Sequence, residues 1–220
     1  MIIVAKDDIL RTKTYSMQEI TLATDEAEAG FSQQKALINQ SIRGDAEAFK
    51  KLVEGFRSMV FNLSLRLTGD YNEALDLSQD VLLKIYLNLK SFRYQSSFQT
   101  WIYRLTINTA RNRYYWWKRR RKQQTISLGS LQDIPQQRDI DDPEKLLLRN
   151  ELKRKIQQGI SRLRFHYSSV LILRDIEMLS YEEISQILNI SQGTVKSRLS
   201  RARSLLKEHL KDYLRKMPQN

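Results

Sequence analysis

Residues 180–206 carry three local signals that together restrict the fold more than any other part of the chain. Ser180-Tyr-Glu-Glu183 is a capping box, in which the serine hydroxyl accepts from a backbone N–H and the glutamate carboxylate reaches back. Asn189 to Ser191 forms a tight turn, and Ser191 can cap the helix that follows. The first helix has an apolar face of Ile184, Ile187 and Leu188, and the second has one of Val195, Leu199, Ala202 and Leu206. This spacing predicts a helix-turn-helix.

The outward face of the second helix carries short hydrogen-bond donors and long cations. Successive residues turn by about 100 degrees, so Lys196, Ser197, Ser200, Arg201 and Ser204 lie opposite Val195. Such side chains read base edges and phosphates in a major groove, although an isolated basic face is more often only solvated. Combined with the capping box and the turn, they predict a surface for duplex DNA made of Lys196, Ser197, Arg198, Ser200, Arg201 and Arg203.

The rest of the chain also predicts helices. Apolar residues recur every three or four positions, and Gly44-Asp45 and Gly69-Asp70 are stop-and-cap pairs between helices. Pro143 suits a first helical turn. We therefore predict an all-α chain with two helical domains joined by a flexible linker. The predicted parts are a poorly ordered or loosely helical extension (1–34), a first domain (35–122), a linker (123–142) and the helix-turn-helix domain (143–216).

The net charge of +12 is unevenly distributed along the sequence. Between Lys90 and Thr125 there are ten basic residues and no acidic one, and the stretch from Lys196 to Lys216 is basic again. Two cationic patches attract polyanions, so nucleic acid is the expected partner.

Several classes of chemistry are not expected. The chain has no cysteine, which excludes disulfides and thiolate metal sites. There is no Gly-rich phosphate loop, and the two histidines are interpreted as structural or surface residues, since His166 lies in an aromatic segment without a carboxylate nearby in sequence. We expect no catalytic residue, metal or cofactor. No apolar run approaches the roughly 20 residues that span a bilayer, so we expect a cytoplasmic protein without direct membrane insertion.

A helix predicted from Phe98 to about Trp117 places cations beside aromatic rings. Its inner stripe is Phe98, Ile102, Leu105, Thr109 and Trp116, and a polar loop with two aromatic residues precedes it. Interleaved rings and cations suit single-stranded DNA, because rings stack on bases while Arg follows the backbone. For Trp101 and Trp116 individually a place in the core is at least as good an interpretation. The predicted strand-binding residues are Phe92, Arg93, Tyr94, Ser96, Ser97, Phe98, Trp101, Arg104, Asn108, Arg111 and Tyr115.

The helix predicted over 72–89 has two apolar faces. Ala74, Ser78, Val81, Ile85 and Leu89 form its inner stripe. A second face combines acidic and apolar side chains, which would repel phosphate and suit a protein partner. Burial of the helix on most sides is an equally good alternative. The residues of this second face are Asp76, Gln79, Asp80, Leu83, Lys84 and Leu87.

Eight motifs in register resemble those of extracytoplasmic-function (ECF) sigma factors, small two-domain members of the sigma-70 family. The resemblance covers about residues 39–210. The motifs are Gly44-Asp-Ala-Glu-Ala-Phe49, Asp76-Leu-Ser-Gln-Asp80, Ser91-Phe-Arg93, Ser97-Phe-Gln-Thr-Trp-Ile-Tyr-Arg104, Asn108-Thr-Ala-Arg-Asn112, Asp142-Pro-Glu144, Leu179-Ser-Tyr-Glu-Glu-Ile184 and Gly193-Thr-Val-Lys-Ser-Arg198.

This resemblance implies a transcription initiation factor rather than an enzyme. The helix around Asp76 and Asp80 would dock on the clamp helices of the largest subunit of core RNA polymerase. The loop at 92–98 would capture a flipped base of the minus-ten element, and the second domain would bind the minus-thirty-five element and the polymerase flap. An anti-sigma factor, in some cases at the membrane, and a stress or envelope regulon are also implied. The alternative is a stand-alone helix-turn-helix regulator that binds its operator without polymerase.

Overall fold

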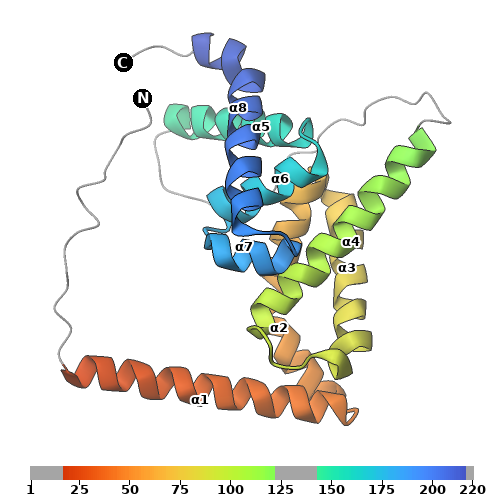
Figure 1. Ribbon diagram of the computed structural model, residues 1–220, viewed down its shortest axis with the longest axis vertical. Coiled ribbons are helices and arrows are strands. Elements are labelled where there is room, and N and C mark those ends of the chain that lie inside the picture. The colour runs from red at the N-terminus through yellow and green to blue at the C-terminus, as the bar shows by residue number, and fades with distance from the viewer. Residues whose placement is uncertain (1–16, 122–142, 217–220) are drawn as a thin grey trace. The chain divides into compact units, whose positions relative to one another are not determined.

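The computed structural model describes residues 17–121 and 143–216, which are helical and contain no strand (Figure 1). This confirms the all-α prediction, whereas the predicted linker lies outside the described residues. The elements are α1 (Met17–Ile42), α2 (Ala46–Thr68), α3 (Tyr71–Asn88), the 3₁₀ turn η1 (Leu89–Ser91), α4 (Phe98–Arg121), α5 (Pro143–Ser161), α6 (Phe165–Leu171), the π-helical turn η2 (Ile172–Ile176), α7 (Tyr181–Leu188) and α8 (Gln192–Lys216).

The chain divides into two compact units, Met1–Leu52 and Val53–Asn220. The first unit holds α1 and the start of α2, and Ile38 and Ala48 are buried. Residue 34, the predicted end of the N-terminal extension, lies inside α1. Within the second unit we call residues 53–121 the first module and residues 143–216 the second module.

The two predicted stop-and-cap pairs are confirmed. Gly44 and Gly69 adopt φ values of 98° and 73°, a region that glycine enters without the steric cost of a Cβ. The Asp45 carboxylate accepts from the backbone N–H of Ala48 at 3.0 Å, and the Asp70 carboxylate accepts from that of Glu73 at 2.8 Å. Each pair therefore ends one helix and begins the next, as the sequence predicts.

The core of the first module lies between α3 and α4, which pack against each other. Val81 and Ile85 on α3 and Ile102 on α4 are fully buried. The inner stripe predicted for residues 72–89 is buried at all five positions, which are Ala74, Ser78, Val81 and Ile85 on α3 and Leu89 at the start of η1.

In the second module α8 packs against α5, α6 and α7. The helix-turn-helix is confirmed in detail. Ser180 Oγ accepts from the Glu183 N–H at 3.2 Å, and the Glu183 carboxylate accepts from the Ser180 N–H at 2.8 Å. Asn189 ends α7 in the left-handed conformation, and Ser191 Oγ accepts from the Thr194 N–H at 3.2 Å to cap α8.

The two modules pack against each other inside the second unit, mainly through α4 and α7. Glu177, which follows η2, forms the main polar link between them. Its carboxylate pairs with the Arg66 guanidinium on α2 and accepts from the Tyr103 hydroxyl on α4 at 2.8 Å. The Gln157 side chain on α5 donates to the Arg66 carbonyl at 3.0 Å. These contacts hold the helix-turn-helix beside α4.

Candidate nucleic-acid interface

The outward face of α8 is exposed as predicted. Lys196, Ser197, Ser200 and Arg201 lie on the surface, while Val195, Leu199 and Ala202 are buried beneath them. The flanking arginines behave differently. Arg203 is bonded to Asp175, with Nε 2.9 Å from Oδ2, and half-buried Arg198 lines a cavity that faces α4. Of the six residues predicted to contact duplex DNA, four are therefore exposed without such an engagement, whereas Arg198 and Arg203 are held elsewhere.

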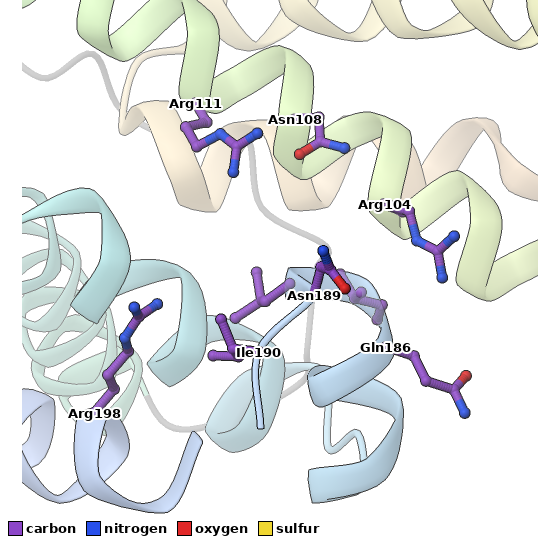
Figure 2. A pocket seen from close by; sticks show the side chains of 9 residues that line it. Arg104, Asn108, Arg111, Gln186, Asn189, Ile190 and Arg198 are labelled. Atoms are coloured by element: carbon purple, nitrogen blue, oxygen red, sulfur yellow. The ribbon is translucent and has the colours of Figure 1, made fainter. Parts of the chain in front are cut away.

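A row of polar side chains follows one side of α4. Arg104 and Asn108 are half-buried, and Arg111 and Tyr115 are exposed. In Figure 2, Arg104, Asn108 and Arg111 extend from α4, and Arg198 and Asn189 lie on the facing elements. The five side chains line one cavity of about 650 Å³. Residues predicted to bind two different DNA elements are thus brought together.

The loop before α4 covers an aromatic cluster. Phe92 and Phe98 are buried, and their ring centroids lie 5.3 Å apart and 5.5 Å from that of Trp101. The exposed Tyr94 ring packs on Phe92, with centroids 4.7 Å apart. Ser97 Oγ accepts from the Thr100 N–H at 3.0 Å and caps α4. The buried rings support the loop, while Arg93 and Tyr94 are exposed and Ser96 is half-buried at its tip.

The prediction that Trp116 belongs to the inner stripe of α4 is wrong. Trp116 is 42% exposed, and the guanidinium of Arg120 lies 4.2 Å from the centroid of its ring. Residues 115–120 are all exposed, so nothing within residues 17–121 and 143–216 buries this end of α4. Trp101, by contrast, is half-buried and belongs to the aromatic cluster.

The second face of α3 is exposed, so the alternative that this helix is buried on most sides is wrong. Leu83 and Leu87 are 57% and 66% exposed, and Asp76, Gln79 and Asp80 lie on the surface beside them. Lys84 differs, because it is half-buried and its Nζ lies 3.2 Å from Thr109 Oγ1 on α4. The sequence pattern did not single out Leu75 and Tyr86, which are 40% and 51% exposed and enlarge the apolar area on α3.

Arg113 is a further residue that the sequence pattern did not single out. It lies in the acid-free basic run of α4, but its guanidinium faces α3. Its nitrogens lie 3.3 Å from the Glu73 carboxylate, 3.6 Å from that of Asp76 and 3.7 Å from that of Asp80. Arg113 therefore balances the acidic face of α3 instead of adding to the cationic side of α4. Nothing in the local sequence pairs residues so far apart.

Two kinds of feature are absent from the parts of the chain that the structure describes. Within residues 17–121 and 143–216, no three His, Asp or Glu side chains are grouped as a metal site requires. No helix in those two ranges is long and apolar enough to cross a membrane.

Comparison with known proteins identifies the family. The sequence model of the family sigma-70 region 2 matches residues 52–123, and that of the family sigma-70 region 4 matches residues 153–206. The chain is 34% identical over 186 residues to the RNA polymerase sigma-H factor of Pseudomonas aeruginosa, covering 83% of this chain and 96% of that protein. It is 33% identical over 181 residues to the ECF RNA polymerase sigma factor SigW of Bacillus subtilis, covering 81% of this chain and 97% of that protein.

A solved structure agrees with these matches. The sigma factor RpoE of Bartonella quintana, in complex with the anti-sigma factor NepR, superposes with a TM-score of 0.58 at 25% sequence identity. The superposition covers 76% of this chain and 98% of that chain. With the helix-turn-helix, the cationic α4 and the acidic face of α3 in place, the chain belongs to the sigma-70 family, as an ECF-type RNA polymerase sigma factor.

Proposed function

We propose that this sigma factor binds core RNA polymerase through α3, brings it to promoters through α8 and promotes strand opening through α4 and the loop before it. The observation that carries the proposal is the exposed second face of α3. Leu83 and Leu87 are more than half exposed next to Asp76 and Asp80, on a protein whose charge otherwise suits DNA. A surface that repels phosphate and exposes leucine favours a protein partner, which a stand-alone operator-binding regulator does not need.

The upstream promoter element would be read by α8. Lys196, Ser197, Ser200 and Arg201 are exposed on the helix that a helix-turn-helix inserts into the major groove. Arg198 and Arg203 would contribute only after leaving their present positions at the cavity and at Asp175. The family resemblance adds a contact of this module with the polymerase flap.

The minus-ten element would be held by the first module. Arg93, Tyr94 and Ser96 lie at the loop tip and are placed to contact an extruded base, and Ser97, the cap of α4, lies next to them. The buried Phe92 and Phe98, together with Trp101, hold the loop in shape. On α4, the residues placed to follow the separated strand are Arg104, Asn108, Arg111 and Tyr115.

Strand opening would follow from differential binding. A surface that holds an unstacked base better than duplex shifts the opening equilibrium toward the melted state. Because Arg198 of the second module lines the same cavity as Arg104 and Arg111, binding both promoter elements requires the two modules to separate.

The remaining parts of the proposal concern partners. The clamp helices of the polymerase's largest subunit are the proposed site for α3, and the polymerase supplies all the catalytic chemistry, so the sigma factor itself is not an enzyme and uses no cofactor. We place it in the cytoplasm with the polymerase, controlling a stress or envelope regulon. An anti-sigma factor is the expected inhibitor, since the Bartonella relative was solved with one.

An exchange of charge on α3 tests the docking surface. Asp80 is largely exposed, and its ion pair with Arg113 is long, at 3.7 Å. Exposed ion pairs contribute little stability, so Asp80→Arg should leave the fold intact. We expect Asp80→Arg to lose co-purification with core polymerase. Glu208→Arg, which makes the same charge change at an exposed position on α8, should co-purify as the parent does. Normal co-purification of Asp80→Arg would contradict the docking proposal.

A further inference from the structure

Two adjoining cavities lie between α4 and the second module. The first, of about 650 Å³, is lined by Arg104, Asn108 and Arg111 from α4 and by Arg198 from α8. The second, of about 410 Å³, is lined on one side by aromatic rings. Arg111 and Arg198 line both cavities, so the two form one cleft with a cationic end and an aromatic end. A cleft of this size is typical of small-ligand sites.

The cationic end lacks compensating negative charge. No acidic side chain lines either cavity, and among the described residues no carboxylate pairs with Arg104, Arg111 or Arg198. Arg104 Nε is buried and has no hydrogen-bond partner in the part of the chain that the structure describes. Buried donors without partners are unfavourable, and planar guanidinium groups match phosphate oxygens in geometry and charge. These three arginines therefore favour a phosphate-bearing anion.

The electrostatic field at His166 agrees with this arrangement. Burial lowers the pKa of His166, and the positive charges of Arg198 and Arg164 lower it further. The imidazole is therefore mainly neutral near pH 7, and the lowered pKa is the effect expected beside positive charges that no carboxylate balances.

The aromatic end fits a base. His166 and Tyr167 lie with ring centroids 4.1 Å apart, and Tyr115 and Phe165 line the same cavity. Leu188 lines both cavities and adds an apolar contact. Rings beside cations bind a base and its phosphates together, because the base stacks while Arg holds the charge.

We propose that this cleft binds a free nucleoside triphosphate, with the phosphates against Arg104, Arg111 and Arg198 and the base against the rings of Tyr115, His166 and Tyr167. The volumes of about 650 and 410 Å³ are in the range of small-ligand sites, which suits a single nucleotide. Nucleotide binding does not depend on the proposed function, but its expected effect on promoter binding rests on that function. A ligand that contacts both α4 and α8 stabilises their present packing and occupies side chains proposed to hold the promoter strand.

Isothermal titration calorimetry on the full chain at fixed salt tests the site, with ATP, inorganic tripolyphosphate and a five-nucleotide deoxythymidine strand as the three probes. ATP should bind one to one, and more tightly than tripolyphosphate. Arg198→Gln should weaken the binding of both ATP and tripolyphosphate roughly tenfold or more, which is the size expected for loss of a charge-assisted contact. The control Arg162→Gln removes the same charge at an exposed position outside both cavities and should stay within about twofold, as expected for a distant screened charge.

A second variant tests the aromatic end separately. Tyr167→Leu should weaken the binding of ATP and leave the binding of tripolyphosphate unchanged. Circular dichroism checks that each variant is folded. Absence of saturable ATP binding would overturn the proposal, as would equal weakening in Arg198→Gln and Arg162→Gln or binding of the oligonucleotide alone. Promoter-specific transcription by the same preparation with core polymerase distinguishes failure of the nucleotide proposal from failure of the proposed function. If ATP does not bind but transcription is normal, only the nucleotide proposal is wrong.

Discussion

Replacing Glu177 by glutamine should loosen the packing between the two modules. The Glu177 side chain is 10% exposed and the Arg66 side chain is 33% exposed, so their ion pair is only partly screened by water. The Tyr103 hydroxyl donates to the second carboxylate oxygen at 2.8 Å. Burial raises the pKa of Tyr103, and the bond to Glu177 raises it further, so the hydroxyl keeps its proton and remains a donor. Glu177→Gln keeps the shape and leaves Arg66 without its carboxylate.

The size of the effect follows from this geometry. A hydrogen bond to a charged group contributes about 1.5 to 3 kcal/mol, and the partial exposure of Arg66 argues for the lower half of that range. We expect a loss of about 2 kcal/mol from the packed arrangement, which shifts the ratio of separated to packed molecules by roughly 30-fold.

Distance measurement between spin labels checks this prediction. The chain has no cysteine, so Arg57→Cys on α2 and Glu208→Cys on α8 label one exposed site in each module. In the parent, one narrow distance distribution is expected; in Glu177→Gln, a second and longer population should appear. Glu182→Gln, at an exposed position on α7, is the matched control and should leave the distribution unchanged. An unaltered distribution in Glu177→Gln would refute the reasoning.

Three further predictions concern stability, measured by urea unfolding. Ser180→Ala removes the cap of α7 and should cost about 1 kcal/mol; no change would mean that the capping box does not stabilise the turn. Ile102→Ala empties a fully buried site between α3 and α4 and should cost about 2 to 5 kcal/mol; a loss under about 1 kcal/mol would contradict the core assignment. Burial and the charges of Arg198 and Arg164 lower the pKa of His166 below 6.5, so its unfolded form binds protons more strongly. Stability should therefore fall as pH drops below 6.5, and less steeply in His166→Gln; identical slopes would remove His166 as a cause.

The sequence predicted best the features that depend on neighbouring residues. The capping box at Ser180, the cap at Ser191 and the two Gly-Asp pairs each need only four or five consecutive residues, and all four are found. The buried stripe of α3 followed from helical periodicity alone. Periodicity could not decide whether Leu83 and Leu87 are exposed, because that depends on what covers the other side of the helix.

The features that the sequence did not predict involve residues far apart or the ends of elements. Arg66 and Glu177 are separated by 111 positions, and no local pattern links them. Arg113 belongs to a basic run that predicts DNA binding, but a charge run does not reveal which way each side chain points. The core prediction for Trp116 fails because the stripe of α4 continues beyond the residues that have neighbours to pack against.

Promoter-specific run-off transcription tests the central claim most directly. Purified chain with core polymerase should give a transcript from a defined start, and neither component alone should do so. Start sites mapped after overexpression should share two upstream elements, one for each module. If core and chain together give no specific transcript while the chain alone protects an operator from nuclease, then this protein acts as an independent regulator, and its proposed role as a promoter-recognising subunit of the polymerase is wrong.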